Sequence, residues 1–167
     1  MEIHDEFLDK KLFESIKQYL YSPDFSWYYN EFDTPENEKS DGFFTHNFIN
    51  DGIVGDQNYF TAIGPIFQKL NCRFPLQARA NLNTRNGKME SNFHVDQPNT
   101  KNLHYKIALL YFTTCNAQTL IKTPDGLKKV DSKENRAVVF NGNLLHRTIY
   151  QTDSKVRIIL NLNYIEN

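Results

Sequence analysis

The stretch Val156-Arg157-Ile158-Ile159-Leu160-Asn161-Leu162-Asn163-Tyr164 tells more about the fold than any other part of the sequence. Side chains alternate between the two faces of a β-strand, so its even-numbered positions give one apolar face. The other face carries a cation and two amides, and a dry core would not hold these groups without polar partners. We therefore predict a strand that packs on a core with one face and lines a polar cavity with the other.

A second segment, residues 77–84, alternates in the same way, with Arg79, Asn81 and Asn83 on one face. We expect the two polar faces to form walls of one cavity. Pro124-Asp125-Gly126 is a hairpin turn signal between two short β-type runs. The sequence predicts further strands at 91–96, 105–113, 119–122, 128–130 and 136–141.

The N-terminal part of the chain has helical periodicity instead. Apolar residues recur at three- and four-residue spacing over 5–21, with Asp5 as the expected N-cap, and Ser22-Pro23 would end the helix. Residues 30–41 are polar and acidic and predict a surface loop. A second helix is expected over 56–70, with a restart at Gly64-Pro65 and with Tyr59, Phe60, Ile63 and Phe67 on its buried side. Helices followed by many short strands predict an α+β domain whose helices pack outside a β-sandwich or barrel.

Composition limits the classes of function. A chain of 167 residues with 40% hydrophobic residues forms one domain with a real core. The net charge of −1 argues against a long nucleic acid or an anionic membrane as partner. Two cysteines outside any CxxC motif, with no apolar span and no signal peptide, lead us to expect a cytoplasmic protein. The sequence does not indicate an oligomeric state.

The segment His94-Val95-Asp96 carries the first sign of chemistry. On a strand, positions i and i+2 point to the same side, so an imidazole nitrogen and a carboxylate oxygen can reach one metal ion. His146 follows in a later segment, and two histidines with one carboxylate form the facial triad suited to non-haem Fe(II). A buried Arg157 nearby would hold a dicarboxylate, because guanidinium and carboxylate pair bidentately.

These residues stand in longer motifs. The motifs are His94-Val95-Asp96-Gln97-Pro98-Asn99, Phe44-Thr45-His46, Arg79-Ala80-Asn81-Leu82, residues 134–140 and residues 157–164. The chain thereby resembles the 2-oxoglutarate- and Fe(II)-dependent dioxygenases. Within that family the chain is more similar to the prolyl-hydroxylase-like branch. Within this branch it is most similar to a group of uncharacterised oxygenases encoded by phages. The likeness covers about residues 44–165. It implies a double-stranded β-helix, a jelly-roll or cupin-like core over about 76–165, after a helical part over about 1–72.

The resemblance also implies roles for single residues. His94, Asp96 and His146 would bind Fe(II), and Arg157 would hold the far carboxylate of 2-oxoglutarate, with O₂ as the second co-substrate. Tyr111 stands where prolyl hydroxylases place a tyrosine that donates to that carboxylate. Asn83 and Asn163 are further candidates for contacts with the co-substrate, although relatives often carry a tyrosine near Asn83.

The sequence thus predicts a dioxygenase that hydroxylates an unactivated C–H bond, with a peptidyl proline as the leading substrate and a small molecule as another. The loop 30–41 and the segment between Asp96 and Tyr105 are the expected substrate contacts. His4, His46 and His104 are not expected to bind metal, and Arg147 should point away from the cavity. Two alternatives remain open. One is a cupin-like metal enzyme that does not use 2-oxoglutarate, and the other is a non-catalytic β-sandwich binding module.

Overall fold

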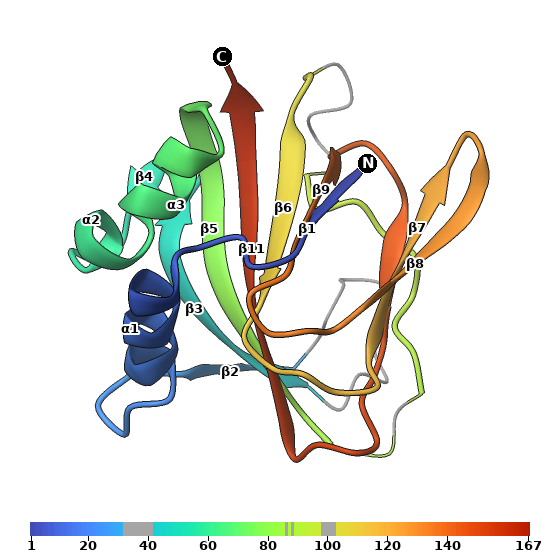
Figure 1. Cartoon of the computed structure of the whole chain (residues 1–167), viewed down its shortest axis with the longest axis horizontal. Helices are drawn as coiled ribbons and strands as arrows, with labels where there is room; N and C mark the ends of the chain where they lie inside the picture. The colour runs from blue at the N-terminus through green and yellow to red at the C-terminus, as the bar shows by residue number, and fades with distance from the viewer. Residues whose placement is uncertain (32–41, 86, 88, 98–102) are drawn as a thin grey trace.

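Two antiparallel β-sheets form the framework of the molecule (Figure 1). The computed structural model describes residues 1–31, 42–85, 87, 89–97 and 103–167. The larger sheet has eight strands in the order β1–β9–β6–β11–β5–β3–β2, with β4 paired to β3. These strands are Glu2–His4 (β1), Tyr28–Asn30 (β2), Phe43–Asn50 (β3), Ile53–Val54 (β4), Cys72–Thr84 (β5), Lys106–Tyr111 (β6), Ala137–Asn141 (β9) and Val156–Glu166 (β11).

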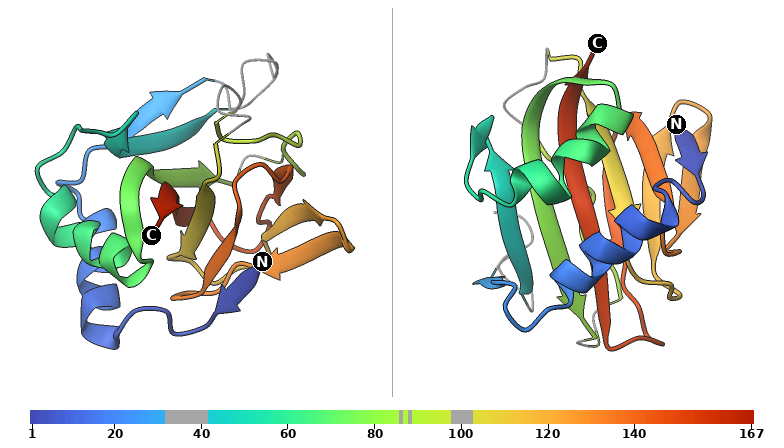
Figure 2. Two further views of the ribbon diagram at one scale, coloured as in Figure 1. Left: turned by 90° about the horizontal axis from the view of Figure 1, so that it is seen from above. Right: turned by 60° about the vertical axis from the view of Figure 1, so that its left-hand side comes forward.

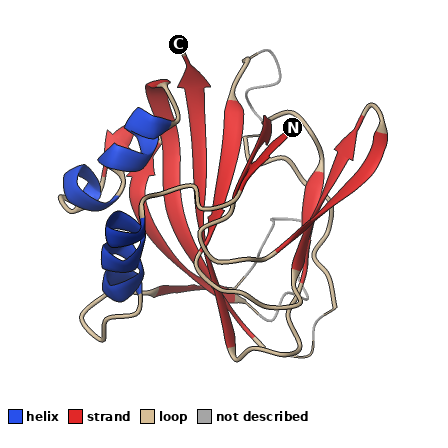
Figure 3. Cartoon of the chain, viewed as in Figure 1, coloured by secondary structure: helices blue, strands red, loops and turns tan. Residues whose placement is uncertain are grey.

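The smaller sheet has the order β10–β7–β8 and consists of Gln118–Thr123 (β7), Gly126–Asp131 (β8) and His146–Ile149 (β10). Helices Lys10–Leu20 (α1), Tyr59–Ala62 (α2) and Gly64–Lys69 (α3) lie on one side of the larger sheet (Figure 3). The β7–β8 hairpin lies on the other side, as the two views of Figure 2 show.

Alternation along the central strands places a hydrophobic cluster on each face of the larger sheet. On the helix side, Leu110, Phe112 and Leu160 pack with side chains of α1 and α3. The ring of Phe13 stacks on that of Phe112 with centroids 5.0 Å apart. On the other face, Ile107, Leu109, Tyr111 and Ile159 pack with Ile121 of β7 and Val130 of β8. The first face is the plain core face that the sequence predicted for β11.

The first helix begins later than expected. Asp9, not Asp5, is its N-cap, because the Asp9 carboxylate accepts a hydrogen bond from the backbone N–H of Leu12 at 3.0 Å. Asp5 instead forms ion pairs with Arg136 (2.6 Å) and Lys133 (3.0 Å). Residues Glu2–His4, which carry no helical periodicity, form strand β1 against β9.

The expected second helix forms as two short ones. Helix α3 restarts at Gly64 with Pro65 in its first turn, as predicted, and Ile63 and Phe67 are buried. Residues 32–41 of the expected acidic loop lie outside the described part of the chain. The prediction of a helical part over 1–72 was incomplete, because strands β1 to β4 also lie there.

The strand predicted at 91–96 was wrong as a regular element. Only isolated bridges form in this region, between Glu90 and Ile149 and between His94 and His146. The other predicted strands are present as β5 to β9 and β11, and the hairpin turn joins β7 to β8. Gly126 has φ of +109°, a backbone conformation that L side chains rarely adopt.

Candidate metal centre

Three side chains from distant parts of the chain meet at one point. The ligand atoms of His94, Asp96 and His146 all lie within 4.8 Å of one another. Oδ1 of Asp96 is 3.3 Å from Nε2 of His146 and 3.6 Å from Nε2 of His94. Two imidazole nitrogens and a carboxylate oxygen at this spacing are a donor set that a ferrous ion accepts.

The backbone pairing of the two histidines explains their proximity. His94 and His146 exchange both backbone hydrogen bonds, each 3.0 Å long, and their ring centroids are 4.6 Å apart. Residues directly opposite each other on antiparallel chains bring their side chains together in this way. A single bridge therefore replaces the longer strand that we expected at 91–96.

Each triad member has further partners that orient it. Nδ1 of His94 lies 3.1 Å from the carbonyl of Asn92, and Nδ1 of His146 lies 3.1 Å from the carbonyl of Leu144. A carbonyl only accepts, so each Nδ1 carries a proton, and in the neutral imidazole Nε2 keeps a lone pair toward the centre.

The second oxygen of Asp96 is held by strand β11. The side-chain amides of Asn161 and Asn163 donate to Oδ2 of Asp96 at 2.8 and 3.1 Å. Asn163 also donates to Oε1 of Gln77 at 3.2 Å. The structure thus places the Asn163 amide on the carboxylate, whereas we had predicted a contact with the co-substrate.

Electrostatics favour an ionised carboxylate beside its histidines. Burial would raise the pKa of Asp96, but the charges of His146, His94 and Arg79 together hold this pKa well below its usual range. Burial also opposes the charged form of His146, yet the adjacent Asp96 raises the pKa of His146. The pKa of His94 is lowered by burial and by its neighbour His146. Asp96 is therefore anionic at neutral pH.

Arg157 is a buried cation that lacks an anion. It is fully buried, and the described part of the chain provides no carboxylate within ion-pairing distance of it. Its guanidinium nitrogens contact hydroxyl groups at 3.2 Å (Thr119), 3.3 Å (Ser132) and 3.5 Å (Thr148). An isolated buried ion costs several kcal/mol, so a guanidinium in these surroundings favours an anionic ligand.

The predicted contact residues Tyr111 and Asn83 lie beside Arg157 in different ways. Tyr111 is fully buried, its ring centroid is 5.3 Å from Cζ of Arg157, and its hydroxyl donates to Thr119 at 2.9 Å. Asn83 faces Arg157 in the strand register and lines a cavity. The sequence analysis missed the hydroxyls of Thr119 and Thr148, which lie directly opposite each other on β7 and β10.

One cavity joins the triad to the surroundings of Arg157. It is walled by the polar faces of β5 and β11 and by the smaller sheet. Its lining includes Phe43, Arg79, Asn81, Asn83, His94, Leu109, Thr119, His146, Thr148, Ile159 and Asn161. The adjacent strands β5 and β11 pair antiparallel, with Arg79 opposite Asn161 and Asn83 opposite Arg157. The prediction that both polar faces wall one cavity is confirmed.

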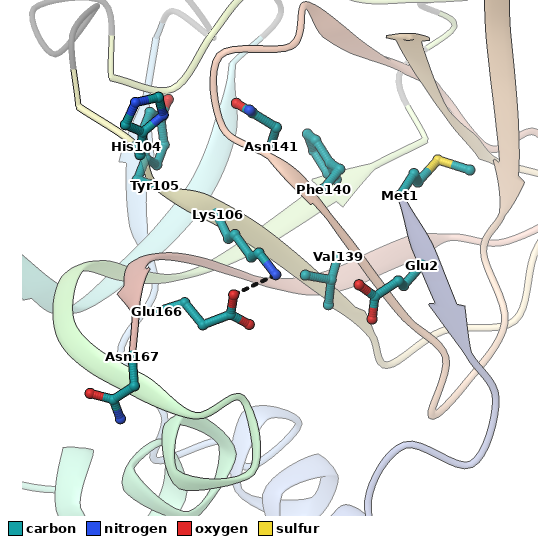
Figure 4. A pocket seen from close by; sticks show the side chains of 10 residues that line it. All are labelled: Met1, Glu2, His104, Tyr105, Lys106, Val139, Phe140, Asn141, Glu166 and Asn167. Atoms are coloured by element: carbon teal, nitrogen blue, oxygen red, sulfur yellow. Dashed lines mark ion pairs between the residues drawn. The ribbon is translucent and has the colours of Figure 1, made fainter. Parts of the chain in front are cut away.

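The remaining histidines and Arg147 lie elsewhere. His104 lines a different hollow of about 450 Å³, where Lys106 pairs with Glu166 at 2.7 Å (Figure 4). His46 contacts Asp56 at 2.7 Å. Arg147 pairs with Glu90 at 2.6 Å and lies over the ring of Phe93. As expected, none of them belongs to the triad.

Comparison with known proteins finds similarity in the fold rather than in the sequence. No protein-family model and no curated protein sequence match the chain. A prolyl-4-hydroxylase from Pseudomonas putida has a TM-score of 0.67 at 16% identity, covering 99% of this chain and 92% of that one. A Trichoplax adhaerens prolyl hydroxylase in complex with a hypoxia-inducible factor peptide has a TM-score of 0.67 at 13% identity, covering 99% and 83%.

A third structural neighbour performs a different reaction. The non-haem, α-ketoglutarate-dependent epimerase of nogalamycin biosynthesis has a TM-score of 0.62 at 9% identity, covering 98% of this chain and 76% of its own. The chain therefore has the largely antiparallel fold of 2-oxoglutarate–Fe(II) oxygenases. Because this fold serves both hydroxylases and an epimerase, the reaction has to be argued from the site.

Proposed function

We propose that this protein is an Fe(II)- and 2-oxoglutarate-dependent dioxygenase with a double-stranded β-helix core. His94, Asp96 and His146 would hold the ferrous ion, and Arg157 would hold the far carboxylate of 2-oxoglutarate. The observation that carries the proposal is the buried Arg157, whose partners in the described part of the chain are all hydroxyls, beside the cavity that His94 and His146 line.

When bound, the iron, 2-oxoglutarate and O₂ convert an unactivated C–H bond to C–OH, while 2-oxoglutarate is oxidised to succinate and CO₂. The chain's own contribution is geometry and shielding. Asn161 and Asn163 fix the Asp96 carboxylate, and the carbonyls of Asn92 and Leu144 fix the two imidazoles. Leu109 and Ile159 give the cavity apolar walls that limit access of water.

A proline within a peptide is the substrate that we propose, because two structural neighbours are prolyl hydroxylases. The test compares 2-oxoglutarate consumption with proline peptides and with the same peptides carrying alanine. Stimulation by the proline peptides alone would support this assignment, and equal rates would exclude it.

None of the described helices is long and apolar enough to cross a membrane.

Two rival functions predict different outcomes. Anaerobic addition of Fe(II) and 2-oxoglutarate should give a weak visible charge-transfer band, and succinate should form once air is admitted. A colourless mixture without succinate would instead indicate a non-catalytic binding module. A cupin-like metal enzyme would bind the metal but keep full turnover after Arg157→Leu, because it has no use for a carboxylate clamp.

A further inference from the structure

Arg79 is a second cation of the cavity, separate from Arg157. It lies on β5 opposite Asn161, whose amide holds Asp96, whereas Arg157 lies opposite Asn83. These two register positions are four residues apart on each strand, which is roughly 13 Å along the sheet. Arg79 is therefore at the triad end of the cavity, whereas Thr119 and Thr148, which contact the buried Arg157, line its other end.

The contacts of Arg79 orient its guanidinium and leave its outer edge available. Its Nε donates to Oδ1 of Asn81 at 2.8 Å, and its Cζ lies 5.9 Å from the ring centroid of Phe43. Within the described residues, its two terminal nitrogens donate no hydrogen bond and no carboxylate pairs with it. A partly buried guanidinium held along one edge and over a ring face is ready to bind an oxyanion with the other edge.

The charge balance of the site shows that Arg79 is not needed for the groups already assigned. This step rests on the proposed function. The two positive charges of a ferrous ion and the charge of Arg157 balance the Asp96 carboxylate and the two carboxylates of 2-oxoglutarate. The charge of Arg79, which also acts on Asp96 from a distance, exceeds this balance by one, and an excess cation in a partly desolvated cavity favours an anionic ligand.

We propose that Arg79 binds a carboxylate of the substrate and so makes this enzyme selective for acidic substrates. The carboxylate would lie next to the triad, close to the carbon that reacts. It can come from an acidic side chain beside the target residue of a peptide or from the free carboxylate of an amino acid. In both cases the guanidinium forms a bidentate pair that an amide cannot replace.

The experiment measures binding without turnover. Protein loaded with Mn(II) in place of iron and with 2-oxoglutarate is titrated by calorimetry with matched acids and amides. One arm compares Glu-Pro with Gln-Pro peptides, and the other compares N-acetylproline and benzoate with their amides. We expect at least one acid to bind roughly 10- to 100-fold tighter than its amide, with the preference lost in Arg79→Gln and partly kept in Arg79→Lys.

Lys122→Gln is the matched control, because Lys122 is an exposed cation outside the cavity. It should keep the acid preference, so a loss there would show a mere effect of net charge and overturn the proposal. Equal binding of every acid and amide, or a preference that survives in Arg79→Gln, would also overturn it. The charge-transfer band of wild-type protein with Fe(II) and 2-oxoglutarate is recorded first. If the band forms and the acid preference is absent, the proposal for Arg79 fails while the proposed function stands.

Discussion

Replacing Arg157 with leucine tests the proposed co-substrate site most directly. The variant removes the guanidinium that Thr119, Ser132 and Thr148 surround, while the triad and its partners Asn161 and Asn163 keep all their contacts. We expect binding of 2-oxoglutarate to be lost and binding of the metal to be retained.

The size of the effect follows from the geometry. A bidentate pair consists of two hydrogen bonds to charged groups, each contributing about 1.5–3 kcal/mol. Losing both costs about 3–6 kcal/mol, which is a roughly 10²- to 10⁴-fold weaker affinity for 2-oxoglutarate. At a ligand concentration of about 100 times the wild-type Kd, binding stabilises the wild type by about 2.7 kcal/mol. A variant bound at least 100-fold more weakly gains about 0.4 kcal/mol or less under the same conditions.

Thermal unfolding of the Mn(II)-loaded proteins reports this difference. For a chain of this length, 2-oxoglutarate should raise the Tm of the wild type by roughly 5–11 °C and that of Arg157→Leu by about 2 °C or less. Arg147→Leu is the matched control, since Arg147 pairs with Glu90 outside the cavity, and it should respond like the wild type. An equal shift in Arg157→Leu, with Mn(II) bound, would refute the role that we propose for Arg157.

The remaining predictions concern the metal ligands and the core. Asn161→Ala and Asn163→Ala each remove a donor to Asp96 and should weaken Mn(II) binding roughly 10- to 100-fold, so an unchanged titration would contradict the orienting role of these amides. In the metal-free protein, burial opposes the charge of His146, but the adjacent Asp96 raises the pKa of His146. Protonated His146 therefore stabilises the folded state fully below about pH 6.5, and this stabilisation is lost as the pH rises through the raised pKa. The urea midpoint should therefore fall as the pH rises above about 6.5, and a slope that persists in Asp96→Asn would rule out this pair as its cause. Phe112→Ala removes a fully buried ring that stacks on Phe13 and should cost about 3–5 kcal/mol of unfolding free energy in urea, whereas a cost below about 1 kcal/mol would mean that α1 does not depend on this contact.

Much of the fold could be predicted because local patterns are strong in the central strands. The alternation in 77–84 and 156–164 gave both the strands and the faces that they turn to the cavity. The region 1–72 was predicted less well. Strand β3 has no clean alternation, since buried residues occur in pairs along it, and β1 has only three residues. Both form because a neighbouring strand satisfies their backbone groups, which local sequence does not encode.

The candidate site divides in the same way. His94, Asp96, His146 and Arg157 were identified from residue type and motif, and the structure brings the three triad residues together. The partners Asn92, Leu144, Thr119 and Thr148 were not identified. Asn92 and Leu144 contact the site through backbone carbonyls, so their residue types carry no signal. Thr119 and Thr148 contact Arg157 through their hydroxyls, but only the pairing of β7 with β10 brings the two together.

By itself, the sequence determined which side chains are candidates for the chemistry and which face of each long strand is polar, because side-chain type and period-two alternation are local properties. Only the tertiary structure decided that the amide of Asn163 holds Asp96, that Arg157 is buried with no carboxylate partner among the described residues, and that Arg79 lies at the triad end of the cavity. Those three facts depend on strand order and register, which are set by contacts between residues far apart in the chain.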